Sequence, residues 1–397
     1  MIFKEVDARQ LAQVEALWDY CFEKKDTPFF QYYFREYCIK ANTVIGGFEK
    51  SGGREVLRTM LHLNPYTVRI RGKKQAAPYI VGVATVPEAR GQHLLAPLLK
   101  TSLEHLRAQG CVFTLLMPIN AGIYLPYEFS FYCYRHAYKM PLASLKLPEF
   151  GKELIVERLA LVEEAIKVLP KLYARLTEGL NGAAERDSLQ WNKLLTVSAL
   201  ENTQCAVVYC AGRVAGYMLY TISEGVFTVV ELLAESFAAK NRLLRYAAQH
   251  KSEAQEFSYL AEAWDKTYLY FADQSQTGSL QPFMMARCLD AQSALMQLEV
   301  AVDVPEGEVA LKLTDNVLKN NNYSLLLYTA PGVLKLRQAD APAEVTMDMG
   351  AFTQLYMGAF SATELWEAGR INCTAPEKLG ILDKLLPKEK NYINEYF

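Results

Sequence analysis

The sequence has almost no net charge. Its 42 Lys and Arg residues face 44 Asp and Glu, which gives a formal net charge of −2 over 397 residues. A chain so near neutrality has no overall attraction for nucleic acid or anionic lipid, so any charged ligand must be recognised locally. Apolar runs of the roughly 20 residues that a membrane span needs are absent, and Lys4, Glu5 and Asp7 are too polar for a signal peptide. We therefore expect a cytoplasmic protein that has neither nucleic acid nor a membrane as a partner.

The sequence also lacks the residue patterns of several catalytic classes. Its eight cysteines stand singly between Cys21 and Cys373, without a C-x-x-C pair, which argues against a disulfide framework and a zinc site. No two of the five histidines are four residues apart, so no metal is expected and the histidines are interpreted as surface or packing residues. A G-x-S-x-G nucleophile elbow and a Walker lysine are missing too. What remains is a group transfer in which a cofactor carries the group.

Length and composition indicate two or three globular domains. A chain of 397 residues exceeds what one hydrophobic core usually serves, and 51% apolar with 22% charged residues is typical of folded proteins. Two helices, an antiparallel meander, a leucine-rich helix and two further strands predict an α/β domain over residues 1–143. A weaker copy of this order follows over 144–280, with a helix expected at 157–172. Residues 281–397 indicate an α+β domain whose strands include 298–304.

The segment 81–99 carries the most specific signal. An apolar strand, 81–86, runs into a turn and then into a helix whose leucines recur at helical spacing. Pro97 has no N–H and fits only the first helical turn, so the unbonded amides are expected on residues 92–96. Together with Arg90, these amides and the partial positive charge of the helix N-terminus suit a diphosphate.

This strand, turn and helix resemble the acetyl-CoA motif of the GNAT acyltransferase superfamily. Arg90 stands at the motif's first position, while His93 and Leu95 occupy positions where small residues are usual. Further regions are similar, in the same order, to the enhanced-intracellular-survival (Eis) acetyltransferases of that superfamily. They are the tyrosine-bearing segment 122–129, the junction 283–287, and the C-terminal segments 360–365, 369–371, 382–387 and 395–397. The resemblance spans essentially the whole chain.

The resemblance implies a GNAT fold at the N-terminus, a second GNAT-like domain without a cofactor site, and a sterol-carrier-like α+β domain at the C-terminus. The turn Leu233-Ala234-Glu235-Ser236 of the second copy agrees, because it offers neither Arg nor Gly to a diphosphate. Acetyl-CoA as the acyl donor and a hexameric assembly are implied as well. Strands ending at Val86 and near Met117 are expected to splay apart, so that the pantetheine arm bonds exposed backbone amides. The residues expected at the cofactor are Val83, Thr85, Val86, Arg90, Gly91, Gln92, His93, Leu94, Leu95 and Asn120.

Two catalytic groups follow from the same resemblance. It puts Tyr124 beside the CoA sulfur, where a phenol of pKa about 10 would give a proton to a leaving thiolate whose thiol has a pKa of about 8.5. It also draws the main-chain carboxylate of Phe397 into the first domain's active site as the general base, since an α-carboxyl is ionised at neutral pH. The alternative is that Tyr396 and Phe397 only dock on the core of the third domain.

The acceptor pocket is expected along the first two helices, where aromatic residues crowd between Trp18 and Tyr37. Aromatic rings together with a carboxylate suit a cationic amine. The residues singled out for this pocket are Asp26, Phe29, Phe30 and Glu395. The other rings are interpreted as ordinary core at helical spacing.

These residues predict an acetyl-CoA-dependent N-acetyltransferase that acts on an amine of a cationic small molecule or on a lysine side chain. A second class of function stays open, namely a catalytically weak sensor that uses the same scaffold to bind CoA or another ligand. The bulk of His93, where glycine would let the backbone approach a phosphate, favours the sensor, although an imidazole could also donate a hydrogen bond to a phosphate oxygen.

Overall fold

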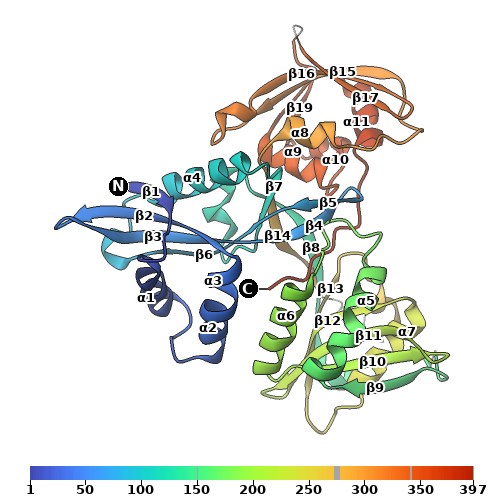
Figure 1. Ribbon diagram of the computed structural model, residues 1–397. Coiled ribbons are helices and arrows are strands. Elements are labelled where there is room, and N and C mark those ends of the chain that lie inside the picture. Colours follow the sequence, from blue (N-terminus) through green and yellow to red (C-terminus); the bar gives the residue numbers. More distant parts are fainter. Residues whose placement is uncertain (150, 272–277, 340–341, 397) are drawn as a thin grey trace. The chain divides into compact units, whose positions relative to one another are not determined.

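The computed structural model describes residues 1–149, 151–271, 278–339 and 342–396. The chain divides into two compact units (Figure 1). The first unit is discontinuous and consists of Met1–Cys133, Asn181–Ala184 and Phe283–Phe397, and the second consists of Tyr134–Leu180 and Glu185–Pro282. The predicted domains 1–143 and 281–397 thus fall mainly in one unit, and the boundaries between the three domains stay a prediction.

The first unit begins with a twisted, mostly antiparallel sheet of strand order β1-β2-β3-β6-β7-β14. Its strands are β1 (Ile2–Glu5), β2 (Thr43–Ser51), β3 (Arg54–Asn64), β6 (Tyr79–Thr85), β7 (Phe113–Leu116) and β14 (Ser279–Cys288), and a hairpin is formed by β4 (Thr67–Ile70) and β5 (Lys73–Ala76). Strands β6 and β7 are parallel, because a helix connects them, and their neighbours are antiparallel. The expected meander and apolar strand are confirmed.

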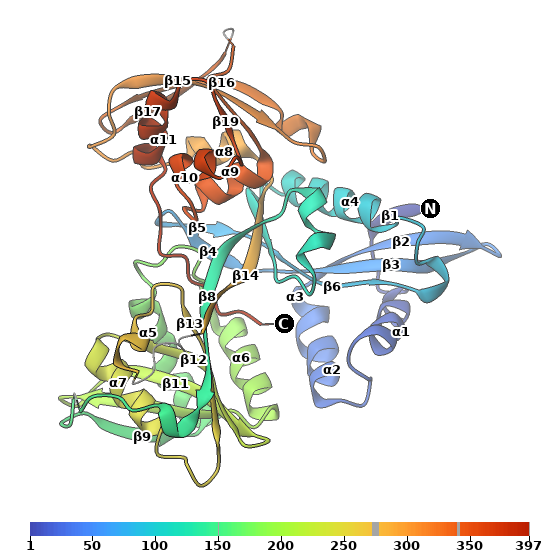
Figure 2. The same cartoon turned by 180° about the vertical axis from the view of Figure 1, so that it is seen from behind.

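Helices cover both faces of this sheet. Figures 1 and 2 show α4 on one face and α1 and α2 on the other. The helical segments are α1 (Leu11–Cys21), α2 (Pro28–Tyr32), a π-helical turn (Tyr33–Cys38), α3 (Ile39–Ala41) and α4 (Leu95–Ala108). Helix α4 buries Leu98, Leu99, Leu103 and Leu106 against the sheet and ends before Gly110, whose φ of +80° only glycine adopts freely.

The C-terminal part of the first unit forms a smaller sheet of strand order β17-β16-β15-β18-β19 with helices packed on it. Its elements are α8 (Ala291–Met296), β15 (Gly307–Thr314), β16 (Tyr323–Ala330), β17 (Val333–Gln338), β18 (Val345–Asp348), α9 (Met349–Tyr356), α10 (Ala362–Glu367), β19 (Asn372–Cys373) and α11 (Leu379–Leu385). The strand predicted at 298–304 is wrong. This segment pairs with no strand in the described chain, and its alternating apolar positions do not share one buried face, since Val302 is 82% exposed.

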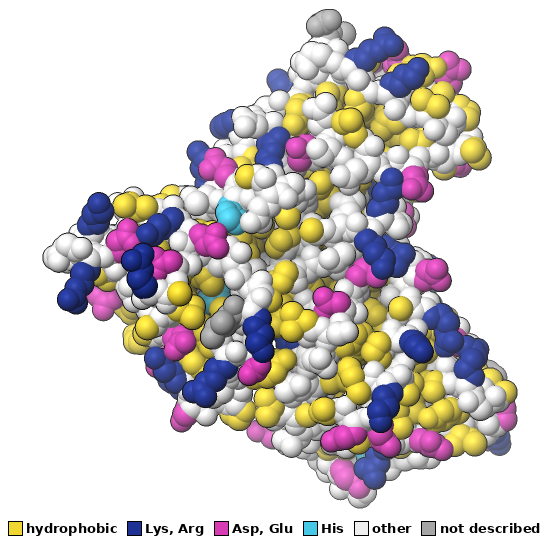
Figure 3. Space-filling view, viewed as in Figure 1, with side chains coloured by type: hydrophobic (Ala, Val, Ile, Leu, Met, Phe, Trp, Pro, Cys, Tyr) yellow, Lys and Arg dark blue, Asp and Glu magenta, His cyan; other side chains and the backbone are white. Residues whose placement is uncertain are grey.

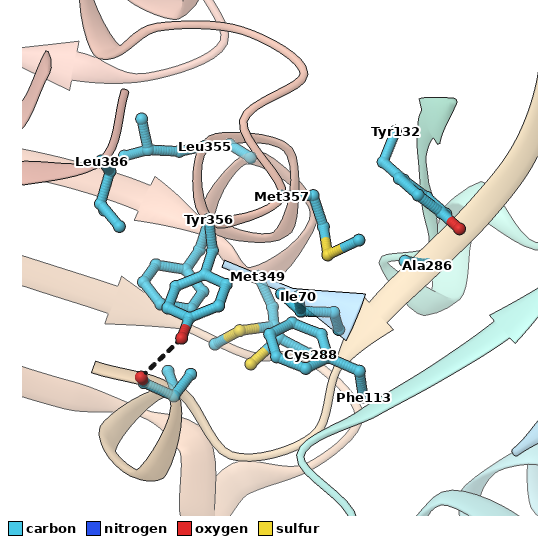
Figure 4. Packing of buried hydrophobic residues seen from close by; sticks show 14 of the residues in the cluster. Ile70, Phe113, Tyr132, Ala286, Cys288, Met349, Leu355, Tyr356, Met357 and Leu386 are labelled. Atoms are coloured by element: carbon cyan, nitrogen blue, oxygen red, sulfur yellow. Dashed lines mark hydrogen bonds between the residues drawn. The ribbon is translucent and has the colours of Figure 1, made fainter. Parts of the chain in front are cut away.

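One hydrophobic core joins this C-terminal part to the N-terminal sheet. In Figure 4, Tyr356 of α9 packs against Phe113 of β7, with ring centroids 5.2 Å apart, and Ile70 and Cys288 lie beside them. The Tyr356 hydroxyl donates a hydrogen bond to the Ala294 carbonyl oxygen at 2.8 Å. Residues almost 300 positions apart in the sequence therefore share one apolar interior within the first unit.

The second unit repeats the meander, helix and parallel strand. Its strand order is β8-β13-β12-β11-β10-β9, in which β12 and β13 are the parallel pair. Its elements are β8 (Ser130–Pro141), β9 (Ile155–Leu159), α5 (Ile166–Leu176), α6 (Ser188–Leu200), β10 (Gln204–Cys210), β11 (Arg213–Ser223), β12 (Val226–Ala234), α7 (Phe237–Ala247) and β13 (Glu256–Glu262). The helix predicted at 157–172 is wrong at its start, because residues 155–159 pair with β10 as an edge strand.

Charged side chains are spread over the surface. Figure 3 shows cationic and anionic groups intermixed on the visible face, which agrees with a formal net charge of −2. In the part of the chain that the structure describes, no helix combines the length and the apolar character that crossing a membrane demands.

Candidate active site

Strands β6 and β7 diverge and open a notch in the first unit. They pair only at Tyr79 and Leu115, where the Leu115 N–H donates to the Pro78 carbonyl at 3.1 Å. On the other side of β6 a bulge sets Gly82 and Val83 opposite a single residue of β3, since the register passes from Met60–Ala84 to His62–Val81. A bulge bends and twists its strand. The expected splaying of these strands is therefore present.

The notch holds a cavity of about 280 Å³. It is lined by Trp18, Phe22, Glu23, Tyr79, Ile80, Val81, Gly82, Val83, Leu116, Met117, Ile119 and Tyr124. The wall formed by α1 and the two residues after it carries aromatic rings and a carboxylate, the strands supply an apolar floor, and Tyr124 supplies a phenol. A small polar reactant on an apolar support suits this lining.

Gly82 lets the indole of Trp18 lie directly against β6. Its φ is +59°, and a Cβ there would stand 2.3 Å from Cζ3 of Trp18. Only glycine accommodates both the backbone angle and the ring. The Trp18 Nε1–H donates to Glu23 Oε2 at 2.8 Å, which fixes that carboxylate at the edge of the cavity.

Tyr124 is held by a compact turn that follows β7. The Asn120 side chain accepts a hydrogen bond from the Gly122 N–H at 2.9 Å and so caps a short 3₁₀ turn. The Tyr124 ring packs edge-on against Phe129, with centroids 6.1 Å apart. Burial raises the pKa of Tyr124, so its phenol stays protonated at neutral pH and is available as a proton donor. Asn120 thus supports this turn through its side chain.

The turn before α4 exposes a series of unused amides. Gly91 has a φ of +78° and His93 a φ of +55°, so the chain winds back on itself ahead of the helix. The helix has no side-chain cap at Leu94. Within the described chain, the following residues donate no backbone hydrogen bond: Gly91, His93, Leu94, Leu95 and Ala96. Unbonded amides at a helix N-terminus form an anion site.

The remaining residues expected at the cofactor are partly engaged. The Gln92 N–H is not among the unbonded amides, since it donates to the Ala89 carbonyl at 3.4 Å. Arg90 is exposed, and its Nε–H donates to the Thr85 carbonyl at 3.2 Å. The Val86 N–H donates to the Arg58 carbonyl at 2.9 Å, whereas Val83 lines the notch.

The acidic and aromatic residues singled out for the acceptor lie outside the lining of the notch. Asp26 is exposed, Phe29 stacks on Tyr33 at 5.9 Å, and Phe30 is buried against Phe34 at 4.5 Å. Trp18, Phe22 and Glu23 line it instead. Sequence reasoning did not single out this trio, although an aromatic pair four residues apart at the end of a helix, followed by Glu, is a recognisable signal.

A buried polar cluster lies behind Trp18. The Tyr33 hydroxyl is 2.9 Å from His62 Nδ1, and the two rings pack against the indole. Burial lowers the pKa of His62 to about 3, so the ring is neutral. His62 is therefore a packing residue, as the sequence suggested.

The C-terminal tail runs past the start of β6. The Tyr392 N–H donates to the Asn181 carbonyl at 2.8 Å, and the Tyr79 hydroxyl donates to the Glu395 carbonyl at 3.4 Å. Glu395 is buried, and the ring of Tyr396 lies 5.3 Å from that of Phe283. Phe397 lies outside the described residues, so its role as a base stays a prediction. Since Tyr79 lines the notch, the tail lies near it.

Metal ligands do not gather anywhere in the described chain: no three His, Cys, Asp or Glu side chains come together as a metal ion would require.

Family comparisons identify three domains. Residues 3–132 and residues 182–288 each match a family described as acetyltransferase (GNAT) domain, and residues 291–394 match a family described as sterol carrier protein domain. No curated protein matches the sequence. The first match includes the notch, Tyr124 and the turn before α4.

Solved structures share the fold over the whole chain. One is a conserved protein of unknown function from Enterococcus faecalis V583, a probable N-acyltransferase, with 20% identity and a TM-score of 0.87 over 100% of this chain and 99% of that one. A GCN5-related N-acetyltransferase from Anabaena variabilis has 18% identity and a TM-score of 0.83, with 100% of both chains covered. Eis1 from Mycobacterium abscessus has 14% identity and a TM-score of 0.75, also over 100% of both. At these identities the likeness concerns the fold.

The α/β fold class and the Eis-like domain order expected from the sequence are confirmed. Two GNAT acetyltransferase domains followed by a sterol carrier protein domain make this chain an N-acetyltransferase of the GNAT type.

Proposed function

We propose that the first GNAT domain transfers an acetyl group from acetyl-CoA to an amine of a cationic small molecule or of a lysine side chain. The observation that carries the proposal is the notch between β6 and β7, which combines a protonated phenol, an aromatic and acidic wall, and a nearby turn of unused amides. A hexamer is part of the proposal, because the resemblance to the Eis acetyltransferases implies it. A cytoplasmic location is proposed too, on the polar residues at the start of the sequence.

The donor would bind along β6 and the turn that follows. The unbonded amides of Gly91 and of residues 93–96 would hold the diphosphate, with the exposed Arg90 as counter-charge and Gln92 beside them. His93 has left-handed backbone geometry and an exposed side chain, so its imidazole could donate a hydrogen bond to a phosphate oxygen. The pantetheine arm would follow Val83, Thr85 and Val86 toward the notch.

The chemistry requires three groups around the thioester carbonyl. The amine nitrogen attacks that carbon, a C–N bond forms, and the C–S bond breaks with its electron pair left on sulfur. Tyr124 gives its proton to the thiolate and is reprotonated from solvent. The proton of the attacking amine passes to the general base, for which the carboxylate of Phe397 is the candidate. The course of the tail past Tyr79 supports this role.

The acceptor would carry positive charge beyond the reacting amine. The carboxylate of Glu23 stands beside the rings of Trp18 and Phe22, and such a group attracts an ammonium through charge and through the ring faces. Asp26, Phe29, Phe30 and Glu395 stay as predicted contributors outside the described cavity. The substrate pocket would thus be acidic and aromatic.

The decisive experiment replaces Tyr124 by Phe. Release of the CoA thiol is measured with polyamines, aminoglycosides and lysine peptides as acceptors. We expect kcat to fall by about 10²-fold, because a general acid typically contributes that much, while the Kd for acetyl-CoA stays unchanged. Tyr328→Phe, a partly exposed tyrosine on β16 of the sterol carrier domain whose hydroxyl donates to Glu306, is the matched loss of a phenol and should leave kcat as it is. Full turnover in Tyr124→Phe would contradict the proposal.

The sensor is the second candidate, and one observation favours it. An imidazole at a left-handed position stands where small residues are usual in the acetyl-CoA motif. Calorimetry separates the two functions, because a sensor binds acetyl-CoA tightly and releases no thiol with any of the amines above.

A further inference from the structure

A buried guanidinium links the sterol carrier domain to the turn that carries Tyr124. Arg287 lies on β14 and is fully buried. Its Nε–H donates to the Tyr127 carbonyl at 2.8 Å, and its Nη2 donates to Asp315 Oδ1 at 2.7 Å. Its Nη1 donates to the Cys288 carbonyl at 2.7 Å. The forked guanidinium of arginine, with five N–H donors, can serve three acceptors at once in this way.

The segment that carries Tyr124, residues 120–128, is called the tyrosine turn, and the Tyr127 carbonyl lies at its C-terminal end. The Tyr127 N–H donates to the Tyr124 carbonyl at 3.0 Å, and the next residue, Glu128, leaves the turn with a φ of +63°. A residue other than glycine is strained in the left-handed region, so surrounding contacts must hold its backbone there. The bond from Arg287 holds the peptide plane between Tyr127 and Glu128, in the same turn as Tyr124 and three residues after it.

Asp315 is a rigid partner for the guanidinium. It follows β15 in the sterol carrier domain, and its Oδ1 also accepts hydrogen bonds from the Val317 N–H at 2.9 Å and the Leu318 N–H at 2.7 Å. Its Oδ2 accepts from Asn321 Nδ2 at 3.2 Å. The carboxylate is thus held by its own loop, and a displacement of that loop would displace Arg287.

A second carboxylate faces the same guanidinium. Glu128 is buried, its Oε1 accepts from the Asn316 N–H at 3.0 Å, and its Oε2 lies 3.7 Å from Arg287 Nη2. This Oε2 has no hydrogen-bond partner in the described chain. The loop after β15 therefore contacts the C-terminal end of the tyrosine turn twice, through Arg287 at Tyr127 and directly at Glu128.

We propose that Arg287 is a positioning residue for acetyl transfer: it aligns Tyr124 through the Tyr127 carbonyl and makes the rate depend on the loop 315–322 of the sterol carrier domain. The proposal rests on the proposed function, in which Tyr124 is the proton donor. A merely structural contact at this place would be better served by an apolar side chain, because burying a charge is costly even when it is paired.

A double-mutant cycle tests the proposal. The variants are Arg287→Lys, Tyr124→Phe and both together, assayed for kcat and for KM with acetyl-CoA. We expect Arg287→Lys to lower kcat about tenfold with KM changed by less than about twofold, because misalignment affects the chemical step more than binding. In the Tyr124→Phe background the same change should have almost no further effect. If the fold-losses in kcat of the two single variants multiply in the double variant, the proposal is overturned.

The loop contributes a second, milder variant. Asp315→Asn keeps an acceptor oxygen of the same shape but removes the charge, and it should lower kcat about threefold to tenfold, again only when Tyr124 is present. If Arg287→Lys does not fold, the proposal is tested by Asp315→Asn alone, in the native chain and in the Tyr124→Phe background. Arg337→Lys, an exposed arginine on β17, is the control and should leave kcat unchanged. An Asp315→Asn variant with native kcat would contradict the link to the loop.

The outcomes separate this inference from the proposed function. If Tyr124→Phe retains native kcat, the proposed function fails and the inference falls with it. If Tyr124→Phe lowers kcat while Arg287→Lys acts additively, the function stands and the inference alone is wrong.

Discussion

The first GNAT domain leads from β6 through an open turn into α4, and the second leads from β12 into α7 by the same route. In the first domain the helix has no side-chain cap, and several amides before it stay unbonded. In the second, Ser236 caps the helix by accepting a hydrogen bond from the Ala239 N–H at 3.2 Å. The second helix terminus is therefore closed by its own side chain, whereas the first is left available to an anion.

The two domains differ in the same way at the bulge. The first has Gly82 there, beside a cavity, whereas in the second the extra residue is Val230 and the buried Glu231 stands next to it. Arg186 donates to both carboxylate oxygens of Glu231 at 2.8 and 2.9 Å, and both side chains are 1% exposed. The same arrangement of strands and helix is thus used for two different purposes. Groups left without partners favour binding and catalysis, and groups that are matched internally favour stability.

Breaking the matched pair should have the largest effect. Arg186→Met leaves the buried carboxylate of Glu231 without its cation, so the free energy of unfolding should fall by about 3–5 kcal/mol, measured by urea titration. Because this site belongs to the second domain, the Kd of the folded variant for acetyl-CoA should not change. The double variant Arg186→Met with Glu231→Leu should recover most of the stability. A single variant as stable as the native chain would break the comparison.

The tyrosine turn of the first unit holds a buried carboxyl, that of Glu128, whose Oε2 has no hydrogen-bond partner in the described chain, unlike the two oxygens of Glu231. Burial raises the pKa of Glu128 from 4.5 to about 7, with Asn316, Asp315, Arg287 and Asp348 as the neighbours that modify it. The folded chain then binds this proton more tightly than the unfolded chain does. Stability should decline as pH rises from about 4.5 to about 7, by on the order of 3 kcal/mol.

Glu128→Gln removes this dependence. The difference in unfolding free energy between the variant and the native chain, measured at about pH 5 and about pH 8, should move in favour of the variant at the higher pH. Asp265 of the second unit is the contrast, because Lys240 and several hydrogen bonds outweigh its burial and hold its pKa below the usual value. Equal pH profiles for the Gln variant and the native chain would argue against an unmatched Glu128.

The glycine of the notch allows a smaller, sharper test. Gly82→Ala should destabilise the protein by about 2–3 kcal/mol, since it adds both left-handed strain and a clash with Trp18. Gly52→Ala is the matched control, because Gly52 also has a positive φ but nothing within 4 Å of the added Cβ. It should lose only about 1 kcal/mol. Equal losses of stability in the two variants would mean that the Trp18 ring moves away from the added Cβ at little cost in free energy.

The smallest effects are expected from one substitution at the N-terminus of each of the two helices, α4 and α7. Arg90→Ala should weaken acetyl-CoA binding about tenfold in a calorimetric titration and leave stability unchanged. Ser236→Ala should lower the free energy of unfolding by about 1 kcal/mol and leave binding unchanged. If Ser236→Ala weakened acetyl-CoA binding, the assignment of separate tasks to the two termini would be wrong.

The sequence predicted those parts of the fold that local pattern determines. The apolar strand before Pro87, the leucine-rich helix and its end at Gly110 follow from periodicity and from the chemistry of proline and glycine. Strands at the sheet edges were harder to predict. Residues 155–159 continue a helical pattern but pair with β10, and residues 298–304 alternate like a strand but pair with none in the described chain. In both cases tertiary partners decide.

The candidate site was predictable in kind and less so in detail. The diphosphate turn and Tyr124 came from motifs, whereas Glu23 was missed because its place depends on how the chain leaves α1 and on its bond with Trp18. The contacts of Arg287 lie 160 positions away at Tyr127 and 28 positions away at Asp315. Such pairings arise from packing between distant segments, about which short-range patterns carry no information.

The discontinuity of the first unit has a consequence for the order of folding. Its two large parts, Met1–Cys133 and Phe283–Phe397, are separated in sequence by the second unit, and contacts such as that between Arg71 and the Tyr356 carbonyl close loops of almost 300 residues. Closing such loops is slow, because their entropy is lost before the contacts form. During synthesis the nested unit can assemble first, and the acetyltransferase notch must wait for the C-terminal segment to emerge before its surroundings are complete.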